Sequence, residues 1–205
     1  MKASTPAIAR ALLLSGVFTW ALRIDAEPST NAGAPSRAAE ETAPAVAPAA
    51  PERRTIQQFG LTFVLSRSTR SDSTETEEYF LEGESAESWS QMITYQRITL
   101  PEPLGADLYV TWLKKHFEQS PGGPRLKVVQ QGKAASIFGV QYAKTDKSPE
   151  QFGLALVSVA DPRRPNQLHL IQYAINPSRV SLEEMELQVK RWQARFQSQA
   201  ASLAH

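Results

Sequence analysis

A tract rich in alanine and proline, residues 27–53, divides the 205-residue chain into parts of very different composition. It contains nine alanines and five prolines, no aromatic residue, and one aliphatic residue larger than alanine, Val46. Such a tract cannot bury enough apolar surface to offset a chain entropy of about 1–2 kcal/mol per residue, and its prolines favour an extended spacer. We therefore expect a disordered linker over residues 27–54 and a single folded domain over residues 55–205.

The segment before this linker has the pattern of an export signal. Two basic residues precede residues 11–22, a run without charge. Its length fits the roughly 7–15 residues of a signal-peptide core and falls short of the ~20 that span a bilayer as a helix. Residues 1–26 are thus predicted to be a signal peptide, cleaved after Ala26 or Ala21, and the mature protein to be periplasmic or secreted in a bacterium. The alternative is a retained N-terminal membrane anchor.

Charge and cysteine content exclude several functional classes. The chain has 22 Lys and Arg against 21 Asp and Glu, a balance unlike that of a strongly basic nucleic-acid-binding protein. Cysteine is absent, which removes disulfides, thiolate metal sites and a cysteine nucleophile. We expect no nucleic-acid partner, no cofactor, and no membrane span once the signal has been cleaved.

Beyond residue 55, the spacing of apolar residues predicts an α+β fold. Apolar residues at helical spacing predict helices over residues 106–119 and from Ser181 onward, and the polar run 67–78 is predicted to be a loop or hairpin connection. The order β-β-β-α-β-β-β-β-α predicts a mainly antiparallel sheet of about seven strands packed by two helices. The predicted strands are residues 59–65, 79–81, 89–100, 125–130, 136–144, 152–160 and 167–175.

The last helix has the clearest start signal in the sequence. Residues 181–184, Ser-Leu-Glu-Glu, form a capping-box pattern, and Val180 with Met185 has the spacing of a hydrophobic staple. Trp192 and Phe196 follow on the apolar face of this helix. We therefore expect the last helix to pack on the sheet through these aromatic side chains.

No sequence motif points to catalysis or to a metal. His116 and His169 each lack a second histidine or a carboxylate at helical ligand spacing, so packing or exposure is favoured over ligation. The acidic stretch 72–87 lacks the spacing of a calcium loop, and the chain has no G-x-S-x-G, S-x-x-K or phosphate-loop pattern. We predict no catalytic residue and no metal ligand; a hydrolase with a Ser/His/acid site assembled from distant residues is the alternative.

Two loops are candidates for contact with a partner. One contains Glu84, Glu87 and Trp89; burial of Trp89 as an anchor is favoured there over an exposed binding role. The other is the proline-flanked tip with Arg163 and Arg164, which suits an acidic partner. Arginine and tryptophan are over-represented among binding hot spots, so we predict these five residues as partner-binding candidates.

One stretch resembles a known group of proteins. Residues 79–96, YFLEGESAESWSQMITYQ, resemble a GE-x4-W-x2-M-[IV]-T-x-Q pattern in small exported bacterial proteins of unassigned function. Over residues 56–198 the order of elements is similar to that of Mog1/PsbP-like domains, in which an antiparallel sheet lies between helices. The resemblance implies a binding, assembly or chaperone-like module, in some cases linked to secretion machinery, and brings no catalytic residues with it.

These patterns together predict a function in binding. We expect an exported, non-catalytic binding or assembly module of the bacterial envelope whose partner is another envelope or secreted protein. Three further functions compete with this one: a periplasmic inhibitor or immunity protein against a toxin or hydrolase, the hydrolase named above, and a carrier of an apolar ligand between sheet and helices.

Overall fold

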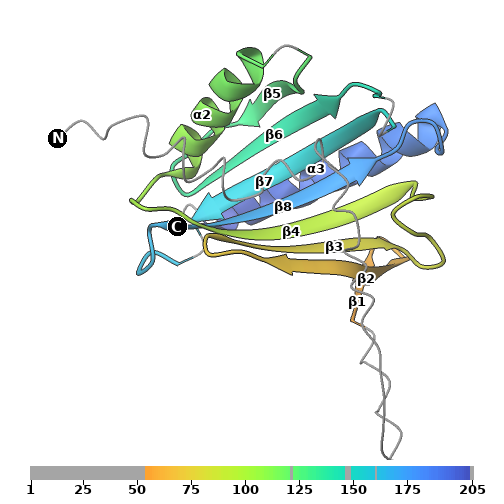
Figure 1. Cartoon of the computed structure of the whole chain (residues 1–205), viewed down its shortest axis with the longest axis horizontal. Coiled ribbons are helices and arrows are strands. Elements are labelled where there is room, and N and C mark those ends of the chain that lie inside the picture. Colours follow the sequence, from red (N-terminus) through yellow and green to blue (C-terminus); the bar gives the residue numbers. More distant parts are fainter. Residues whose placement is uncertain (1–53, 121, 146–148, 160, 204–205) are drawn as a thin grey trace, which may run out of the picture.

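The computed structural model describes residues 54–120, 122–145, 149–159 and 161–203 (Figure 1). The predicted signal peptide, residues 1–26, and the predicted linker up to residue 53 lie outside the described residues. The described residues form one eight-stranded sheet and two helices. The strands are β1 (Thr55–Gln58), β2 (Leu61–Arg70), β3 (Thr74–Leu81), β4 (Gln91–Thr99), β5 (Arg125–Gln130), β6 (Ala135–Tyr142), β7 (Gln151–Val159) and β8 (Gln167–Ile175), and the helices are α2 (Ala106–Glu118) and α3 (Leu182–Leu203).

The strands follow the order β1-β2-β3-β4-β8-β7-β6-β5, and every neighbouring pair is antiparallel. The chain thus makes two four-stranded meanders, each followed by a helix, which join at the centre of the sheet through β4 and β8. That central pairing runs from Gln91 opposite Ile175 to Thr99 opposite Gln167. The predicted α+β class and antiparallel sheet are confirmed.

The strand count differs from the prediction of about seven. Strand β1 has a single large apolar residue, Ile56, so it carries no alternation signal, and it forms by pairing with β2 at the edge of the sheet. The polar run 67–78 is a hairpin in which both arms are strands: β2 extends to Arg70 and β3 begins at Thr74. Cross-strand pairs of opposite charge stabilise such a polar hairpin without an apolar pattern.

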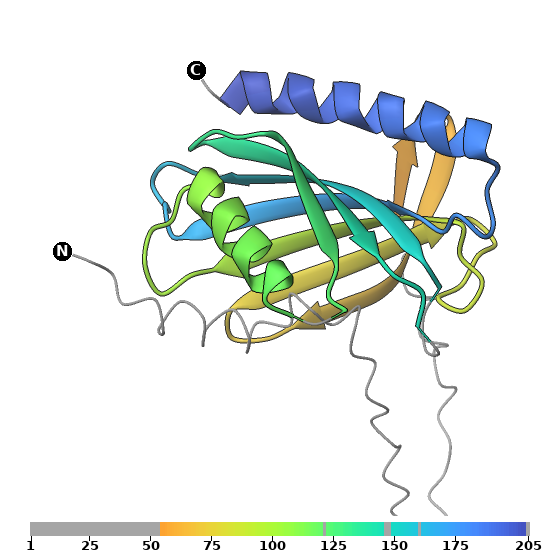
Figure 2. The same ribbon diagram turned by 90° about the horizontal axis from the view of Figure 1, so that it is seen from above.

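The two helices cover opposite faces of the sheet, as the alternation of side chains along β6 shows (Figure 2). Phe138 and Val140 belong to the apolar cluster under α2, whereas Ile137 belongs to the cluster under α3. In Figure 1, α2 lies in front of the sheet on its β5–β6 side and α3 lies behind it. We refer to the two surfaces as the α2 face and the α3 face.

Helix α3 begins and packs largely as its sequence predicts. The backbone N–H of Glu184 donates to the hydroxyl of Ser181 over 3.1 Å, which confirms the N-cap. The Glu184 carboxylate, expected to complete the capping box, accepts a hydrogen bond from the Gln188 side chain over 2.7 Å. Trp192 is 1% exposed and stacks on Tyr173 of β8, with ring centroids 4.8 Å apart.

The tight turn between β1 and β2 ties the edge of the sheet to this helix. Its two residues, Phe59 and Gly60, have φ angles of 51° and 81°, as a two-residue hairpin turn with two positive φ values requires. Such a conformation is uncommon for phenylalanine. The Phe59 ring lies edge-on against Trp192, with centroids 5.3 Å apart at 87°. This contact compensates for the unfavourable backbone and holds β1 against α3.

Candidate functional site

The two loops predicted to contact a partner lie at opposite ends of the sheet. The loop 83–89 precedes Gln91, at the start of β4, and the loop with Arg163 and Arg164 precedes Gln167, which pairs with the end of β4. The nine residues of β4 separate these ends by roughly 30 Å at about 3.3 Å per residue. A compact contact surface can therefore include one of the loops but not both.

The polar and aromatic groups of the loop 83–89 are used mainly to build that loop. Trp89 is 3% exposed, and its ring lies 6.4 Å from that of Phe80. This burial agrees with the anchoring role favoured from the sequence. The Glu84 carboxylate accepts hydrogen bonds from the N–H and hydroxyl of Ser90 (2.8 and 2.5 Å), and exposed Glu87 accepts one from Ser85 (2.7 Å). Of the three predicted contact residues in this loop, only Glu87 is exposed.

At the other end, a row of polar side chains crosses five strands on the α3 face. Arg70, Glu75, Arg97, His169 and Ser158 stand directly opposite one another on β2, β3, β4, β8 and β7. The Glu75 carboxylate is shared by two guanidinium groups: Arg97 approaches to 2.6 Å and Arg70 to 3.2 Å. Pairing of the strands thus brings together charges from three separate segments.

A second ion pair lies beside this row. The Arg54 guanidinium donates two hydrogen bonds to Glu77, over 2.7 and 3.1 Å, and holds the pKa of the Glu77 carboxyl below its ordinary value. The Tyr79 hydroxyl donates to the same carboxylate over 2.7 Å. Burial, together with this bond to Glu77, raises the pKa of Tyr79 to about 12. Glu77 is therefore an ionised acceptor at neutral pH and Tyr79 a neutral donor.

Two adjoining pockets open along these charges. The α3-end pocket, about 510 Å³, lies where the last turn of α3 meets the sheet, and its lining includes Leu156, Ile171, Arg54, His169 and Leu203. The hairpin pocket, about 250 Å³, adjoins the β2–β3 turn, and its lining includes Arg70, Asp72, Thr99, Arg164 and Gln167. Glu75 and Arg97 line both pockets.

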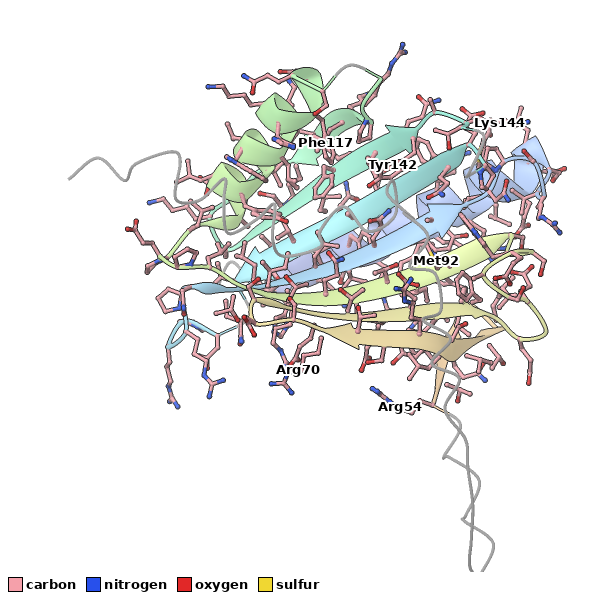
Figure 3. The ribbon with its side chains drawn as sticks, viewed as in Figure 1. Arg54, Arg70, Met92, Phe117, Tyr142 and Lys144 are labelled. Atoms are coloured by element: carbon pink, nitrogen blue, oxygen red, sulfur yellow. The ribbon has the colours of Figure 1, made fainter. Side chains whose placement is uncertain are left out.

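We call this end of the molecule, comprising both pockets and the row that crosses them, the arginine end. It is the left-hand end of the sheet in Figure 1, where α3 ends and the β7–β8 loop turns. In Figure 3, Arg70 lies below the left half of the sheet and Arg54 below its middle, both beyond β2.

Of the two neighbouring arginines predicted to contact a partner, only one lines the hairpin pocket. Arg164 lines the hairpin pocket, and Arg163 is exposed without being part of that lining. The loop that carries them is fixed at both ends: the Arg163 N–H donates to the Asp161 side chain over 2.9 Å, and the Asn166 side chain donates to the Leu100 carbonyl over 3.2 Å. These bonds fix the loop backbone on either side of Arg164, which lines the hairpin pocket.

The arrangement around His169 differs from that of a hydrolase triad. Ser158 stands opposite His169 on β7, but the residue opposite His169 on its other side is Arg97, and the nearest acid in the row, Glu75, lies beyond that arginine. Burial lowers the pKa of His169, and the positive charge of Arg97 lowers it further. A triad needs a carboxylate against the imidazole, which would raise that pKa.

The part of the chain that the structure describes also bears on a metal site and a membrane span. It contains no group of three or more His, Asp or Glu side chains that could hold a metal ion. Neither α2 nor α3 combines the length and apolar composition that a bilayer-crossing helix requires. His116 stacks on Trp112 along α2, with centroids 5.3 Å apart, and does not line either pocket of the arginine end.

Comparison with known proteins returns no match for this chain among family models, curated proteins or solved structures. The resemblance to Mog1/PsbP-like domains therefore stays a prediction from the motif at residues 79–96 and the order of elements.

Sequence reasoning found Arg164 but missed Arg54, Arg70, Glu75 and Arg97. A signal for part of this set is present in the sequence. Arg70 and Glu75 lie at equal distances from the midpoint between Asp72 and Ser73, as do residues 67 and 78, which are also of opposite charge. A polar run with mirrored opposite charges predicts a hairpin whose arms pair those charges. No comparable signal aligns β4 or β8 with this hairpin.

Proposed function

We propose that this protein is an exported, non-catalytic binding module of the bacterial envelope that holds another envelope or secreted protein at the arginine end. The observation that carries the proposal is the gathering of Arg54, Arg70, Arg97 and Arg164 around two adjoining pockets. Arginine is enriched at protein interfaces, where its planar fork of donors pairs with carboxylates and its stem covers apolar surface. Apolar side chains in the lining of the α3-end pocket, such as Leu156 and Ile171, add surface that a partner can bury.

Two features favour binding over catalysis. The imidazole of His169 faces a guanidinium rather than a carboxylate, which disfavours the protonated form that a general base must pass through. The Glu75 and Glu77 carboxylates are held in ion pairs, so neither is positioned as a general acid. A hydrolase would lose its activity on replacement of His169. A binding module tolerates His169→Ala if the variant folds.

An inhibitor or immunity protein and a carrier of an apolar ligand differ in what would occupy the arginine end. An inhibitor or immunity protein would use the same charged surface to block a toxin or hydrolase, so it is a special case of partner binding. A carrier needs an enclosed apolar cavity. The α3-end pocket has a suitable volume, but charged side chains such as Arg54 and Glu77 form part of its wall. Partner binding accounts best for that mixed lining.

The proposal is tested by capture of the partner from envelope extracts. The bait is the full chain, and the test variant reverses two charges, Arg70→Glu with Arg164→Glu. Because both side chains are exposed, we expect the variant to lose the captured protein while keeping its circular-dichroism spectrum; its melting temperature should fall slightly, because a carboxylate at position 70 would face Glu75. Capture by the unaltered bait should weaken as salt is raised, since exposed charges are screened over about 8 Å in physiological salt.

Two matched controls locate the surface. Arg125→Glu reverses an exposed arginine on β5, at the far edge of the sheet, and should retain capture. Glu87→Lys reverses the exposed charge of the opposite loop and leaves Glu84, which accepts two hydrogen bonds from Ser90, in place. If that second variant loses the partner while the Arg70 and Arg164 variant keeps it, the partner binds at the other end of the sheet and the proposal fails.

Export is tested separately. N-terminal sequencing of the protein recovered from the envelope should give a mature start near Glu27. Recovery of the full-length chain in the membrane pellet would instead indicate a retained anchor.

A further inference from the structure

We infer that the hairpin pocket is a binding site for a single carboxylate group, presented by an acidic side chain of the partner. The inference rests on the proposed function for the identity of the bearer. The site itself rests on the residues that line the pocket, which are drawn from the β2–β3 hairpin, the end of β4 and the loop before β8.

The charge of the lining favours one negative group. Three arginines, Arg70, Arg97 and Arg164, face two carboxylates, Asp72 and Glu75, so the pocket has one positive charge in excess. A monoanion neutralises that excess. A phosphate dianion overshoots it and places its second charge near Asp72 and Glu75, which repel it. Charge complementarity therefore selects a carboxylate.

The three arginines of the hairpin pocket differ in how far ion pairs restrict their side chains before a ligand binds. Glu75 holds Arg97 over 2.6 Å and Arg70 over 3.2 Å, which reduces the freedom of both side chains before a ligand arrives. Arg164 lines the pocket and has no ion-pair partner among the described residues. A guanidinium carries five N–H donors, so Arg97 retains donors beyond those that reach Glu75. An incoming carboxylate thus meets the Arg164 guanidinium beside that of Arg97, which Glu75 already orients.

Polar groups around these charges can complete the hydrogen bonds of the ligand. Thr99 and Gln167 stand opposite each other on β4 and β8, and both line the pocket. A hydroxyl and a side-chain amide each donate to a carboxylate oxygen. The pocket also adjoins the α3-end pocket through Glu75 and Arg97, so the residue that bears the carboxylate has a place for its neighbours along the chain.

The test is a titration of the isotope-labelled full chain, followed by NMR of backbone amides and arginine Nε–H groups at constant ionic strength. The probe is N-acetyl-aspartyl amide, and N-acetyl-asparaginyl amide is its neutral isostere. We expect saturable shifts at Arg164, Thr99 and Gln167 with the aspartyl probe alone. Equal shifts with the asparaginyl probe would overturn the inference. So would tighter binding of inorganic phosphate, tested as a third probe.

The loop offers a matched pair of variants. Arg164→Gln should raise the Kd for the aspartyl probe about fivefold or more, because a charge-assisted contact is lost. Arg163→Gln removes the neighbouring charge, which does not line the pocket, and should change the Kd less than about twofold since it is screened by solvent. Equal effects of the two variants would show that the probe responds to general surface charge, and the inference fails.

Failure of this inference is distinguishable from failure of the proposed function. If the aspartyl probe binds at the pocket and the charge-reversed bait still captures its partner, the carboxylate site stands and the arginine end is not the partner surface. If capture needs Arg70 and Arg164 but the aspartyl probe gives no shift, the partner binds here through other groups and the carboxylate site is refuted.

Discussion

Arg97 and His169 stand directly opposite each other on the two central strands of the sheet, β4 and β8, on the face that carries α3. A fixed positive charge next to a partly buried imidazole disfavours a second positive charge, so the pKa of His169, already lowered by burial, lies below its ordinary value of 6.5. The pair therefore keeps His169 neutral in the folded protein at a pH where the unfolded chain already binds a proton.

This relationship predicts how stability depends on pH. Because the folded-state pKa of His169 is depressed, its contribution to stability is fully present above about pH 6.5 and is lost as the pH falls through the folded-state pKa. We expect the urea midpoint of the unaltered chain to fall between about pH 7.5 and about pH 5.5. His169→Gln should flatten that fall. A slope that is the same in both proteins would contradict the prediction.

A second prediction concerns the aromatic contacts that attach α3 to the sheet. Trp192 touches Phe59, Tyr173 and Phe196, with ring centroids 5.3, 4.8 and 5.4 Å away, and is 1% exposed. Trp192→Ala should therefore lower the free energy of unfolding by ~3–5 kcal/mol, through lost burial and the cavity that remains. Chemical denaturation measures this loss.

The control for this prediction lies on the same helix. Leu187 is 42% exposed, so Leu187→Ala should change the free energy of unfolding by about 0.5 kcal/mol or less. A Trp192→Ala midpoint equal to that of Leu187→Ala would show that α3 is not held through this cluster.

The N-cap of α3 gives a third, smaller effect. The Ser181 hydroxyl accepts the N–H of Glu184, one of the groups that a helix start leaves without an intrahelical partner. Ser181→Ala should cost about 1 kcal/mol, and Ser181→Asp, which keeps an acceptor, should restore most of it. Thermal unfolding of the two variants compares them directly. Equal destabilisation by both would mean that the cap bond contributes nothing.

The elements that sequence predicts well are those with a local signal. The sequence predicts a helix over residues 106–119, and α2 is found at Ala106–Glu118, because its apolar spacing and the Pro-Gly-Gly-Pro run after it act within a few residues. Strand β1 is missed because its only large apolar side chain is Ile56, and it exists by pairing with β2. Edge strands of this kind depend on tertiary contacts that a single strand's sequence does not encode.

The sequence predicts one residue of the candidate site, Arg164. Arg164 is found because turn-forming residues mark an exposed loop in any fold. Arg97 lies in a strand whose side chains alternate in polarity, so the sequence alone does not single it out. Its place in the site is known only from the pairing of β4 with Glu75 on β3 and with His169 on β8. The register between β4 and β8 joins residues about 70 positions apart in the chain, such as Arg97 and His169, so it cannot be derived from local pattern.

A last prediction compares two buried hydroxyls, one bonded and one not. The Ser136 hydroxyl, fully buried on β6, accepts the N–H of Gly132 over 3.1 Å and donates to its carbonyl over 3.0 Å. The Thr94 hydroxyl on β4 is also buried, in a residue 2% exposed, but has no hydrogen-bond partner among the described residues.

Removal of the Ser136 hydroxyl should therefore lower the free energy of unfolding, whereas removal of the Thr94 hydroxyl should leave it unchanged or raise it. Ser136→Ala leaves the N–H and carbonyl of half-buried Gly132 without their hydroxyl partner and should cost about 1 kcal/mol of unfolding free energy. Thr94→Val replaces an unpaired hydroxyl by a methyl group of similar shape and should be neutral or stabilising, because the cost of burying a polar group without a partner disappears. Urea unfolding of both variants under one set of conditions makes the comparison. A clear loss of stability in Thr94→Val would show that its hydroxyl is bonded in the folded protein, and that the α2 face of β4 is packed differently from the arrangement described.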